Sequence, residues 1–228
     1  MLNLLDERLG GTLSAFEVFW KDYYELVAAS DPPLASGSPF YVLLEALGGA
    51  AESDRERFLD AMAAASAKGL VADAVICKSG DERQSLWNLR DSVDKTLRFG
   101  QAYIFDVSLR LSQMEAYVDE VLAGLNAEFS AHKTWVFGHA GDGNLHIVVA
   151  PGEAEDFAAA KLRERVEHAV YAPLQAVGGS VSGEHGIGLE KKRWLSSSRN
   201  AAELELMRRL KNMLDPHGIL NPGRVIDV

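Results

Sequence analysis

The sequence predicts an α+β protein in which helices cover an antiparallel or mixed sheet. Two observations lead to this prediction. Short apolar segments of strand length alternate with longer segments that carry apolar residues at helical spacing. Two short segments, 134–138 and 144–151, flank a glycine-rich turn and predict a hairpin. No sharp linker divides the 228 residues, so we expect a single domain, 1–228, with a helical C-terminal extension.

The predicted elements follow one another from residue 40 onward. The strands are expected at 40–48, 70–78, 102–109, 134–138 and 144–151, and the helices at 53–69, 79–99, 111–129, 155–179 and 200–214. Three of these helices have a capping box at the start, formed by Ser53 with Glu56, Ser112 with Glu115, and Asn200 with Glu203. The helix at 111–129 carries an apolar stripe of Met114, Val118, Val121, Leu125 and Phe129.

The composition favours a protein that binds small molecules or other proteins. The chain has 23 basic and 33 acidic residues, a net charge of −10 and a pI near 5.1. Binding to nucleic acids or anionic membranes needs clustered Lys and Arg, so neither partner is expected. No segment has the roughly 20 apolar residues of a membrane-spanning helix. The single Cys77 excludes an intrachain disulfide, lies in an apolar run that predicts burial, and fits a cytoplasmic protein.

The stretch GHAGDGNLH, residues 138–146, has a histidine at each end of a glycine-rich turn. Glycine, aspartate and asparagine suit such a turn, but histidine has no role in forming it. A third histidine, His185, follows Glu184 in another glycine-rich segment. Imidazole and carboxylate are typical ligands of a catalytic first-row metal, which favours His139, His146 and Glu184 as a metal site. The alternative is a hairpin whose two histidines bind nothing.

Arg90 occupies an apolar position of its predicted helix, four residues after Leu86 and three before Val93. A buried guanidinium needs an anion beside it. One interpretation is an internal salt bridge to Asp94 or Asp106. The other is a clamp on a substrate carboxylate, which the planar guanidinium binds through two parallel hydrogen bonds.

Five motifs together resemble the C-terminal domain of the FAD-linked oxidase family, flavoproteins that dehydrogenate D-2-hydroxy acids such as D-lactate, glycolate and D-2-hydroxyglutarate. The motifs are, in order, LWNLRDSV, IFDVSL, GHAGDGNLHIVV, GGSVSGEHGIGLEKKRWL and LDPHGILNPGRVI. The resemblance implies a ferredoxin-like α+β domain that caps a flavin, with the FAD held mainly by an N-terminal domain of the vanillyl-alcohol-oxidase type. It also implies that Asn144 and Asn221 lie near the flavin or the substrate.

The resemblance implies a role for each of the other candidate residues. His139, His146 and Glu184 would bind a divalent metal, which could be zinc, manganese or iron. His185 would be the catalytic base, and Arg90 would hold the substrate carboxylate. The metal would lower the pKa of the substrate hydroxyl, His185 would take its proton, and hydride would pass to the flavin.

The chain departs from the family pattern because it contains no recognisable flavin domain. Neither GHAGDG nor GEHGIG has the preceding strand, glycine spacing and following helix of a dinucleotide fingerprint. We therefore expect an isolated C-terminal domain that is inactive alone. Its expected partners are a small 2-hydroxy acid and an FAD-binding domain or subunit, and a homodimer stays open.

A second departure concerns the substrate. Family members that act on 2-hydroxyglutarate tend to have a hydroxyl, a lysine and an asparagine at the places of Asp94, Ile104 and Val148. A second carboxylate has no evident partner here, which predicts a monocarboxylate such as D-lactate or glycolate, or a bulkier apolar 2-hydroxy acid. Two other classes remain open, a stand-alone metal-binding or ligand-sensing domain of ferredoxin-like fold without redox activity, and a structural subunit.

Overall fold

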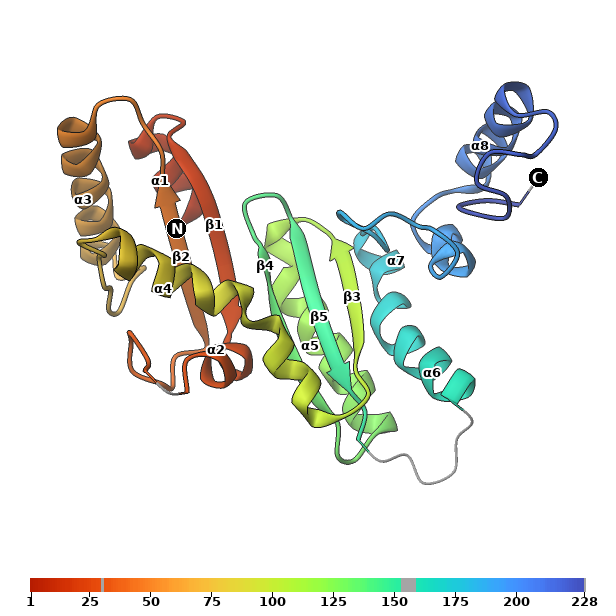
Figure 1. Ribbon diagram of the computed structural model, residues 1–228, viewed down its shortest axis with the longest axis horizontal. Helices are drawn as coiled ribbons and strands as arrows, with labels where there is room; N and C mark the ends of the chain where they lie inside the picture. The colour runs from red at the N-terminus through yellow and green to blue at the C-terminus, as the bar shows by residue number, and fades with distance from the viewer. Residues whose placement is uncertain (30, 153–158, 228) are drawn as a thin grey trace. The chain divides into compact units, whose positions relative to one another are not determined.

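The computed structural model describes residues 1–29, 31–152 and 159–227 (Figure 1). By its internal contacts the chain divides into two compact units. Unit 1 comprises Met1–Arg98 and Trp135–Asp142, and unit 2 comprises Phe99–Thr134 and Gly143–Val228. Each unit combines helices with strands, and every strand pairing described within a unit is antiparallel. The predicted α+β class is therefore confirmed.

Unit 1 is built on three strands in the order β2-β1-β4. Their bounds are β1 Leu13–Trp20, β2 Phe40–Ala46 and β4 Lys133–His139. The helices of this unit are α1 Leu2–Leu9, α2 Lys21–Val27, α3 Ala51–Ala67 and α4 Gly80–Asp91, and a 3-10 helix, Ser92–Phe99, follows α4. Leu5, Leu9 and Ala61 are buried between α1, α3 and one face of the strands, where Phe16 and Leu44 pack against them.

The C-terminal end of α4 is tied to the strands of unit 1 through Tyr23. The ring of Tyr23 stacks on Phe137 of β4 with 4.3 Å between the ring centroids. Its hydroxyl donates to the backbone carbonyls of Leu89 and Arg90 at 3.2 and 2.9 Å. Burial raises the pKa of Tyr23, so the phenol stays protonated and remains a donor. The backbone at Arg90 is thereby held against this face.

Unit 2 is built on the antiparallel pair β3 and β5. Its strands and helices are β3 Tyr103–Ser108, α5 Met114–Glu128, β5 Asn144–Ala150, α6 Ala159–Tyr171, α7 Leu174–Val177 and α8 Ala201–Leu214. Two 3-10 helices, Leu111–Gln113 and Lys192–Ser197, complete the unit.

One face of the β3–β5 pair is apolar and is covered by helices. Phe105 of β3 meets the ring of Tyr171 of α6 edge-on at 5.2 Å. The helices α5 and α6 are joined by the Tyr117 hydroxyl, which donates to the Val170 carbonyl at 2.8 Å. The predicted stripe of the helix at 111–129 is confirmed, because all five of its members are buried. Alternate residues of both strands point to the other face, which carries the polar groups described below.

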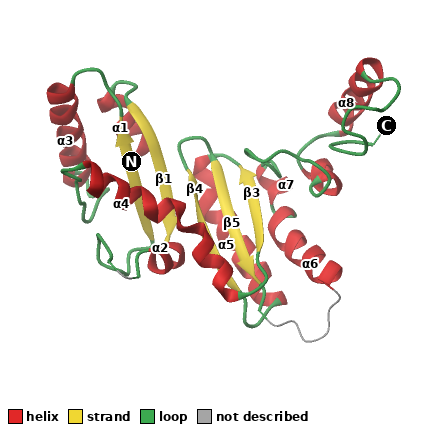
Figure 2. Ribbon diagram, in the orientation of Figure 1, coloured by secondary structure: helices red, strands yellow, loops and turns green. Residues whose placement is uncertain are grey.

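The strand predicted at 70–78 is wrong. This segment forms turns and irregular backbone between α3 and α4 (Figure 2), and Val75 is 49% exposed. Strand formation depends on a partner strand and on burial, which an apolar run does not guarantee by itself. Cys77 is accordingly half-buried, where the sequence predicted burial.

Two of the three predicted capping boxes are wrong. The helix α3 begins earlier, at Ala51, because the Asp54 carboxylate accepts the Ala50 N–H at 2.8 Å. The helix α5 begins later, because the 3-10 turn Leu111–Gln113 precedes it and no side chain caps it. The third capping box is confirmed. The Asn200 side chain accepts the Glu203 N–H, and the Glu203 side chain accepts the Asn200 N–H.

The helix predicted at 155–179 is divided into α6 and α7. Proline 173 has no backbone N–H and disfavours helical geometry at the residue before it, which explains the break after Tyr171. The start of the prediction, 155–158, lies outside the described residues.

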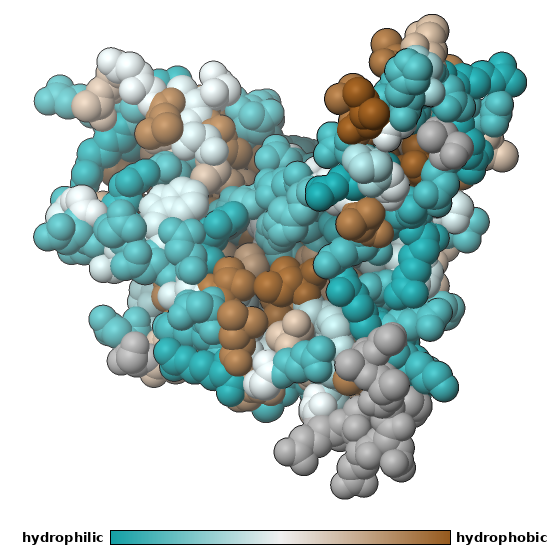
Figure 3. Space-filling model, turned by 45° about the vertical axis from the view of Figure 1, so that its right-hand side comes forward, coloured by the Kyte–Doolittle hydropathy of each residue, from teal (hydrophilic) through white to brown (hydrophobic). Residues whose placement is uncertain are grey.

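The predicted C-terminal extension is confirmed as α8. This helix buries none of its residues and exposes apolar side chains, visible at the upper right of Figure 3. These side chains are Leu206, Leu210, Met213 and Leu214. Within the described part of the chain, no helix has the length and apolar character needed to cross a membrane.

Truncating the core of α5 should lower stability strongly. Leu125 is fully buried, so we expect Leu125→Ala to reduce the free energy of unfolding by about 2–5 kcal/mol through lost burial and a residual cavity. Leu206 is 57% exposed, so Leu206→Ala should stay within about 0.5 kcal/mol of the parent. Urea unfolding measures both changes, and equal losses would contradict the burial of α5.

Candidate functional site

The polar face of the β3–β5 pair organises the candidate site in unit 2. The strand register places Asp106 directly opposite His146, and Ser108 opposite Asn144. These side chains share a face because alternate residues of IFDVSL and NLHIVV point to the same side. Asp106, Asn144 and His146 are all buried. The pattern therefore puts an imidazole, an amide and a carboxylate together on a rigid element.

Asp106 holds the loop that carries two of the predicted site residues. Its carboxylate accepts hydrogen bonds from three consecutive backbone N–H groups, those of residues 183–185, at 3.1, 3.0 and 2.8 Å. The hydroxyl of Ser182 donates to it at 2.8 Å, and the ammonium of Lys191 lies 3.3 Å away. Successive N–H groups that converge on one anion form a concave anion-binding nest.

The charge of Asp106 is stabilised by these contacts. Burial alone would raise the pKa of this carboxyl group, but hydrogen bonds from the His185 N–H, the Ser182 hydroxyl and the Glu184 N–H outweigh burial. Together with the positive charge of Lys191, they hold the pKa of Asp106 well below its usual range. The carboxylate is therefore ionised at neutral pH. Its sequence interpretation as a partner of Arg90 is wrong, because its partners are the 182–185 loop and Lys191.

Three predicted residues come together around this carboxylate. The Glu184 Oε2 and His146 Nε2 atoms are 3.9 Å apart. The rings of His146 and His185 lie 5.7 Å apart at 30° to each other. His185 Nδ1 is 3.9 Å from Asp106 Oδ2, and its side chain is 54% exposed. The cluster thus combines a buried imidazole with an accessible carboxylate and an accessible imidazole.

Asn144 lies beside the same loop, and the polar atoms of its side chain form no hydrogen bonds. It is 2% exposed, and neither its amide oxygen nor its amide nitrogen has a hydrogen-bond partner. A Cβ atom built at Gly183 would lie 2.6 Å from Asn144 Oδ1, so only glycine allows this approach. An unpaired buried amide costs about 1–3 kcal/mol. This arrangement fits the predicted role of Asn144 in binding a cofactor or substrate.

Asn221 lies on the surface, in a turn that follows α8. Its φ angle is 48°, and the turn is closed by the Arg224 N–H, which donates to its carbonyl at 3.2 Å. The turn is attached to the glycine-rich segment by the Val225 N–H, which donates to the Gly188 carbonyl at 2.8 Å. No contact described in the structure joins Asn221 to Asn144. Its expected place near a flavin therefore stays a prediction.

In unit 1, His139 and Arg90 come together at Glu17. The strand register places Glu17 of β1 opposite His139 of β4. The Glu17 carboxylate lies 2.7 Å from His139 Nδ1, and Arg90 Nη2 lies 2.8 Å from His139 Nε2. Arg90 also forms ion pairs with Glu17 at 3.7 Å and with Asp91 at 3.3 Å. The internal ion pair that was one of the two interpretations of Arg90 is thus present, but its partners are Glu17 and Asp91 instead of Asp94 or Asp106.

The sequence interpretation missed Glu17 because it missed the strand that carries it. The segment LSAFEVFW holds a single charge among apolar residues of strand character. Residues 17–19 of this strand are all buried, so both of its faces are covered there and its apolar residues do not alternate with polar ones in the usual way. A lone carboxylate in such a strand is a signal, since a buried charge needs partners.

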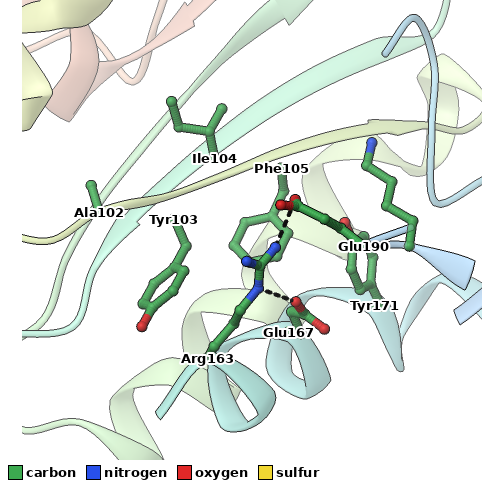
Figure 4. Close-up of a pocket in the computed structure, with 9 residues that line it drawn as sticks. Ala102, Tyr103, Ile104, Phe105, Arg163, Glu167, Tyr171 and Glu190 are labelled. Atoms are coloured by element: carbon green, nitrogen blue, oxygen red, sulfur yellow. Dashed lines mark hydrogen bonds and ion pairs between the residues drawn. The ribbon is translucent and has the colours of Figure 1, made fainter. Parts of the chain in front are cut away.

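A separate cavity of about 260 Å³ lies on the helix side of β3 in unit 2 (Figure 4). Arg163 crosses it and donates to the carboxylates of Glu167 and Glu190 at 2.7 and 2.8 Å. The guanidinium charge is therefore already neutralised. Ile104 points to the opposite side of β3 from Phe105, which places Ile104 on the polar face with Asp106.

Fold and site define an α+β domain with clustered imidazole and carboxylate groups. Comparison with protein families identifies it further. The chain belongs to the family of FAD linked oxidases, C-terminal domain, whose model matches residues 5–225.

Curated relatives agree with this assignment. The chain is 39% identical over 220 residues to a D-2-hydroxyglutarate dehydrogenase of Xanthomonas citri pv. viticola, covering 94% of this chain and 46% of the relative. It is 33% identical over 220 residues to the enzyme of that name from Stutzerimonas stutzeri, covering 93% and 47%. The mitochondrial one of Rattus norvegicus is 36% identical over 224 residues, with coverage of 96% and 40%. The chain thus spans less than half the length of these relatives.

Neutralising Asp106 should destabilise the protein in a pH-dependent way. In Asp106→Asn, the three backbone N–H groups of residues 183–185 would face an amide, which is uncharged and a weaker acceptor than the carboxylate. We therefore expect the free energy of unfolding to fall by about 3 kcal/mol or more near neutral pH. The pKa of Asp106 is lower in the folded protein than in the unfolded chain. The stabilisation by its charge is therefore fully present above the unfolded-state pKa of about 4, and it is lost as the pH falls from there through the folded-state pKa. The stability difference between parent and variant should therefore shrink in acid.

Urea unfolding across this pH range measures the difference. The exposed Asp142 offers a matched control, and Asp142→Asn should change stability little at any pH. A parent-to-variant difference that stays constant from neutral pH into acid would show that Asp106 is not held as an anion.

Proposed function

We propose that this chain is the metal- and substrate-binding domain of an FAD-dependent D-2-hydroxy acid dehydrogenase. The observation that carries the proposal is the cluster of His146, Glu184 and His185 around a buried, ionised Asp106. Membership of the FAD linked oxidase family supports it. The relatives named D-2-hydroxyglutarate dehydrogenase support a D-2-hydroxy acid as substrate. FAD would be held mainly by another portion of the protein or by a partner.

A divalent metal fits the donor groups of the chain. His139 and His146 each offer an imidazole nitrogen, and Glu184 offers a carboxylate oxygen. Metal bonds to such ligands are about 2.0–2.2 Å long, so two ligand atoms 3.9 Å apart, as in His146 and Glu184, can share one ion. The ligand set suits zinc, manganese or iron. Such an ion would lower the pKa of a substrate hydroxyl bound to it.

The chain's own residues would bind the substrate and move its proton. Arg90 would orient the substrate carboxylate, and the closely held guanidinium limits the poses that the 2-carbon can adopt. His185 would accept the hydroxyl proton, since its accessible imidazole lies beside His146. The charge of Asp106, 3.9 Å from His185 Nδ1, would stabilise the imidazolium that forms. The hydride from the 2-carbon would pass to FAD.

The side chain of the substrate is expected to be uncharged. Ile104 and Val148 lie directly opposite each other in the β3–β5 register, one pair along from Asp106 and His146 on the polar face. This apolar pair offers no partner for a second carboxylate. We therefore propose a monocarboxylate or an apolar 2-hydroxy acid, whereas the relatives' name would favour 2-hydroxyglutarate. For its location, the single Cys77 supports a reducing compartment such as the cytoplasm.

Metal titration tests the ligand set. We expect the 228-residue chain to bind one divalent ion, and His146→Ala or Glu184→Ala to weaken binding by at least about 100-fold, since a direct ligand matters more than partners that only orient ligands. His217→Ala, which changes an exposed histidine, should bind like the parent. Calorimetry with a competing chelator gives the affinities. Unchanged binding in both ligand variants would refute the site.

Turnover tests the reaction. With the flavin-binding portion supplied, D-2-hydroxy acids should reduce a dye, and His185→Ala should lower kcat by roughly 100–10,000-fold without changing metal affinity. D-lactate or a longer apolar homologue should be oxidised faster than D-2-hydroxyglutarate, and Ile104→Lys should narrow that gap. Metal binding without turnover would favour a ligand-sensing domain. Faster oxidation of D-2-hydroxyglutarate would refute the substrate proposal alone.

A further inference from the structure

We propose that Glu17 is the positioning residue for the metal ligand His139. It fixes the ring tautomer and orientation of His139, so that Nε2 presents its lone pair to a cation. The inference rests on the proposed metal site, but the tautomer itself can be measured without any metal.

The contact at Nδ1 supplies the first half of the argument. Glu17 and His139 face each other across the β1–β4 pair, with Glu17 Oε1 2.7 Å from His139 Nδ1. An ionised carboxylate can only accept hydrogen bonds, so Nδ1 must carry the proton. Both residues sit on paired strands, which fixes the direction of the ring. Histidines that bind metals commonly donate their second N–H to a carboxylate in this way.

The contact at Nε2 leads independently to the same tautomer. Arg90 Nη2 lies 2.8 Å from His139 Nε2. A guanidinium has only donors, so Nε2 must be the acceptor and must be unprotonated. Both contacts therefore place the ring proton on Nδ1 and the lone pair on Nε2, the nitrogen opposite Glu17. That lone pair can accept a hydrogen bond from a guanidinium or bind a metal ion, but it cannot do both at once.

The burial of Glu17 argues against an incidental ion pair. Glu17 is 4% exposed, and its Oε2 has no hydrogen bond and lies 3.7 Å from Arg90 Nε. A buried carboxylate with one oxygen unbonded is costly to keep for stability alone. Its one short hydrogen bond is to His139. The geometry thus indicates that Glu17 positions His139 rather than Arg90.

Two measurements on the 228-residue chain test the proposal. Nitrogen-15 NMR of the histidine rings, without metal, should show His139 protonated at Nδ1 and unprotonated at Nε2. Chelator-competition titration with Zn²⁺ should show a dissociation constant about 10–100-fold higher for Glu17→Gln than for the parent. The amide keeps the size of the side chain but can donate to Nδ1 as well as accept, so the single tautomer should be lost.

Glu45→Gln is the matched control, since Glu45 lies on the neighbouring strand β2 and pairs with Arg83 instead. It should leave both the tautomer and the Zn²⁺ affinity unchanged. An Nε2-protonated parent, or a Glu17→Gln chain whose affinity equals that of Glu45→Gln, would overturn the proposal. The first of these readouts needs no variant, so a Glu17→Gln chain that fails to fold still leaves a decisive test.

His139→Ala separates this inference from the function on which it rests. If His139→Ala abolishes Zn²⁺ binding while Glu17→Gln binds like the parent, only the role of Glu17 is refuted. If His139→Ala binds Zn²⁺ as well as the parent does, the metal site itself is refuted.

Discussion

The buried carboxylate of Asp106 is the constraint on which the rest of the unit 2 site depends. Three backbone N–H groups, a hydroxyl and an ammonium group converge on it. A buried charge is tolerable only when such donors compensate for its lost hydration. The loop at 182–185, part of the glycine-rich segment 178–188, has little regular structure of its own, so this anion supplies the hydrogen bonds that shape it. Glu184 and His185 take their positions from that loop.

The antiparallel pairs explain why the polar clusters of unit 1 and of unit 2 each sit on rigid elements. In unit 2, the apolar residues of β3 and β5 face the helices, while Asp106 and His146 face the other way. In unit 1, Glu17 and His139 face each other across β1 and β4. In each case a carboxylate lies beside an imidazole, and the strand register rather than a flexible loop sets their alignment. Sites built in this way are preorganised for ligands that need defined geometry.

Sequence reasoning identified the residues whose chemistry is unusual for their surroundings. Histidines in a glycine-rich turn and Arg90 in an apolar register were recognisable, and the α+β class, the apolar stripe of α5 and the cap at Asn200 followed from periodicity. It failed where the outcome depends on distant partners. The apolar run at 70–78 forms no strand, and the strand containing Glu17 was missed, because both depend on which segments cover them.

The sequence by itself therefore determined most of the candidate residues, namely the three imidazoles, the Glu184 carboxylate and the Arg90 guanidinium, together with the class of the fold. These follow from residue type and local spacing. Only the tertiary structure decided which groups each buried carboxylate contacts. Asp106 bonds a loop more than seventy residues away, and Glu17 bonds a histidine more than a hundred residues away. Such pairs are set by strand register and by packing, and local sequence patterns determine neither.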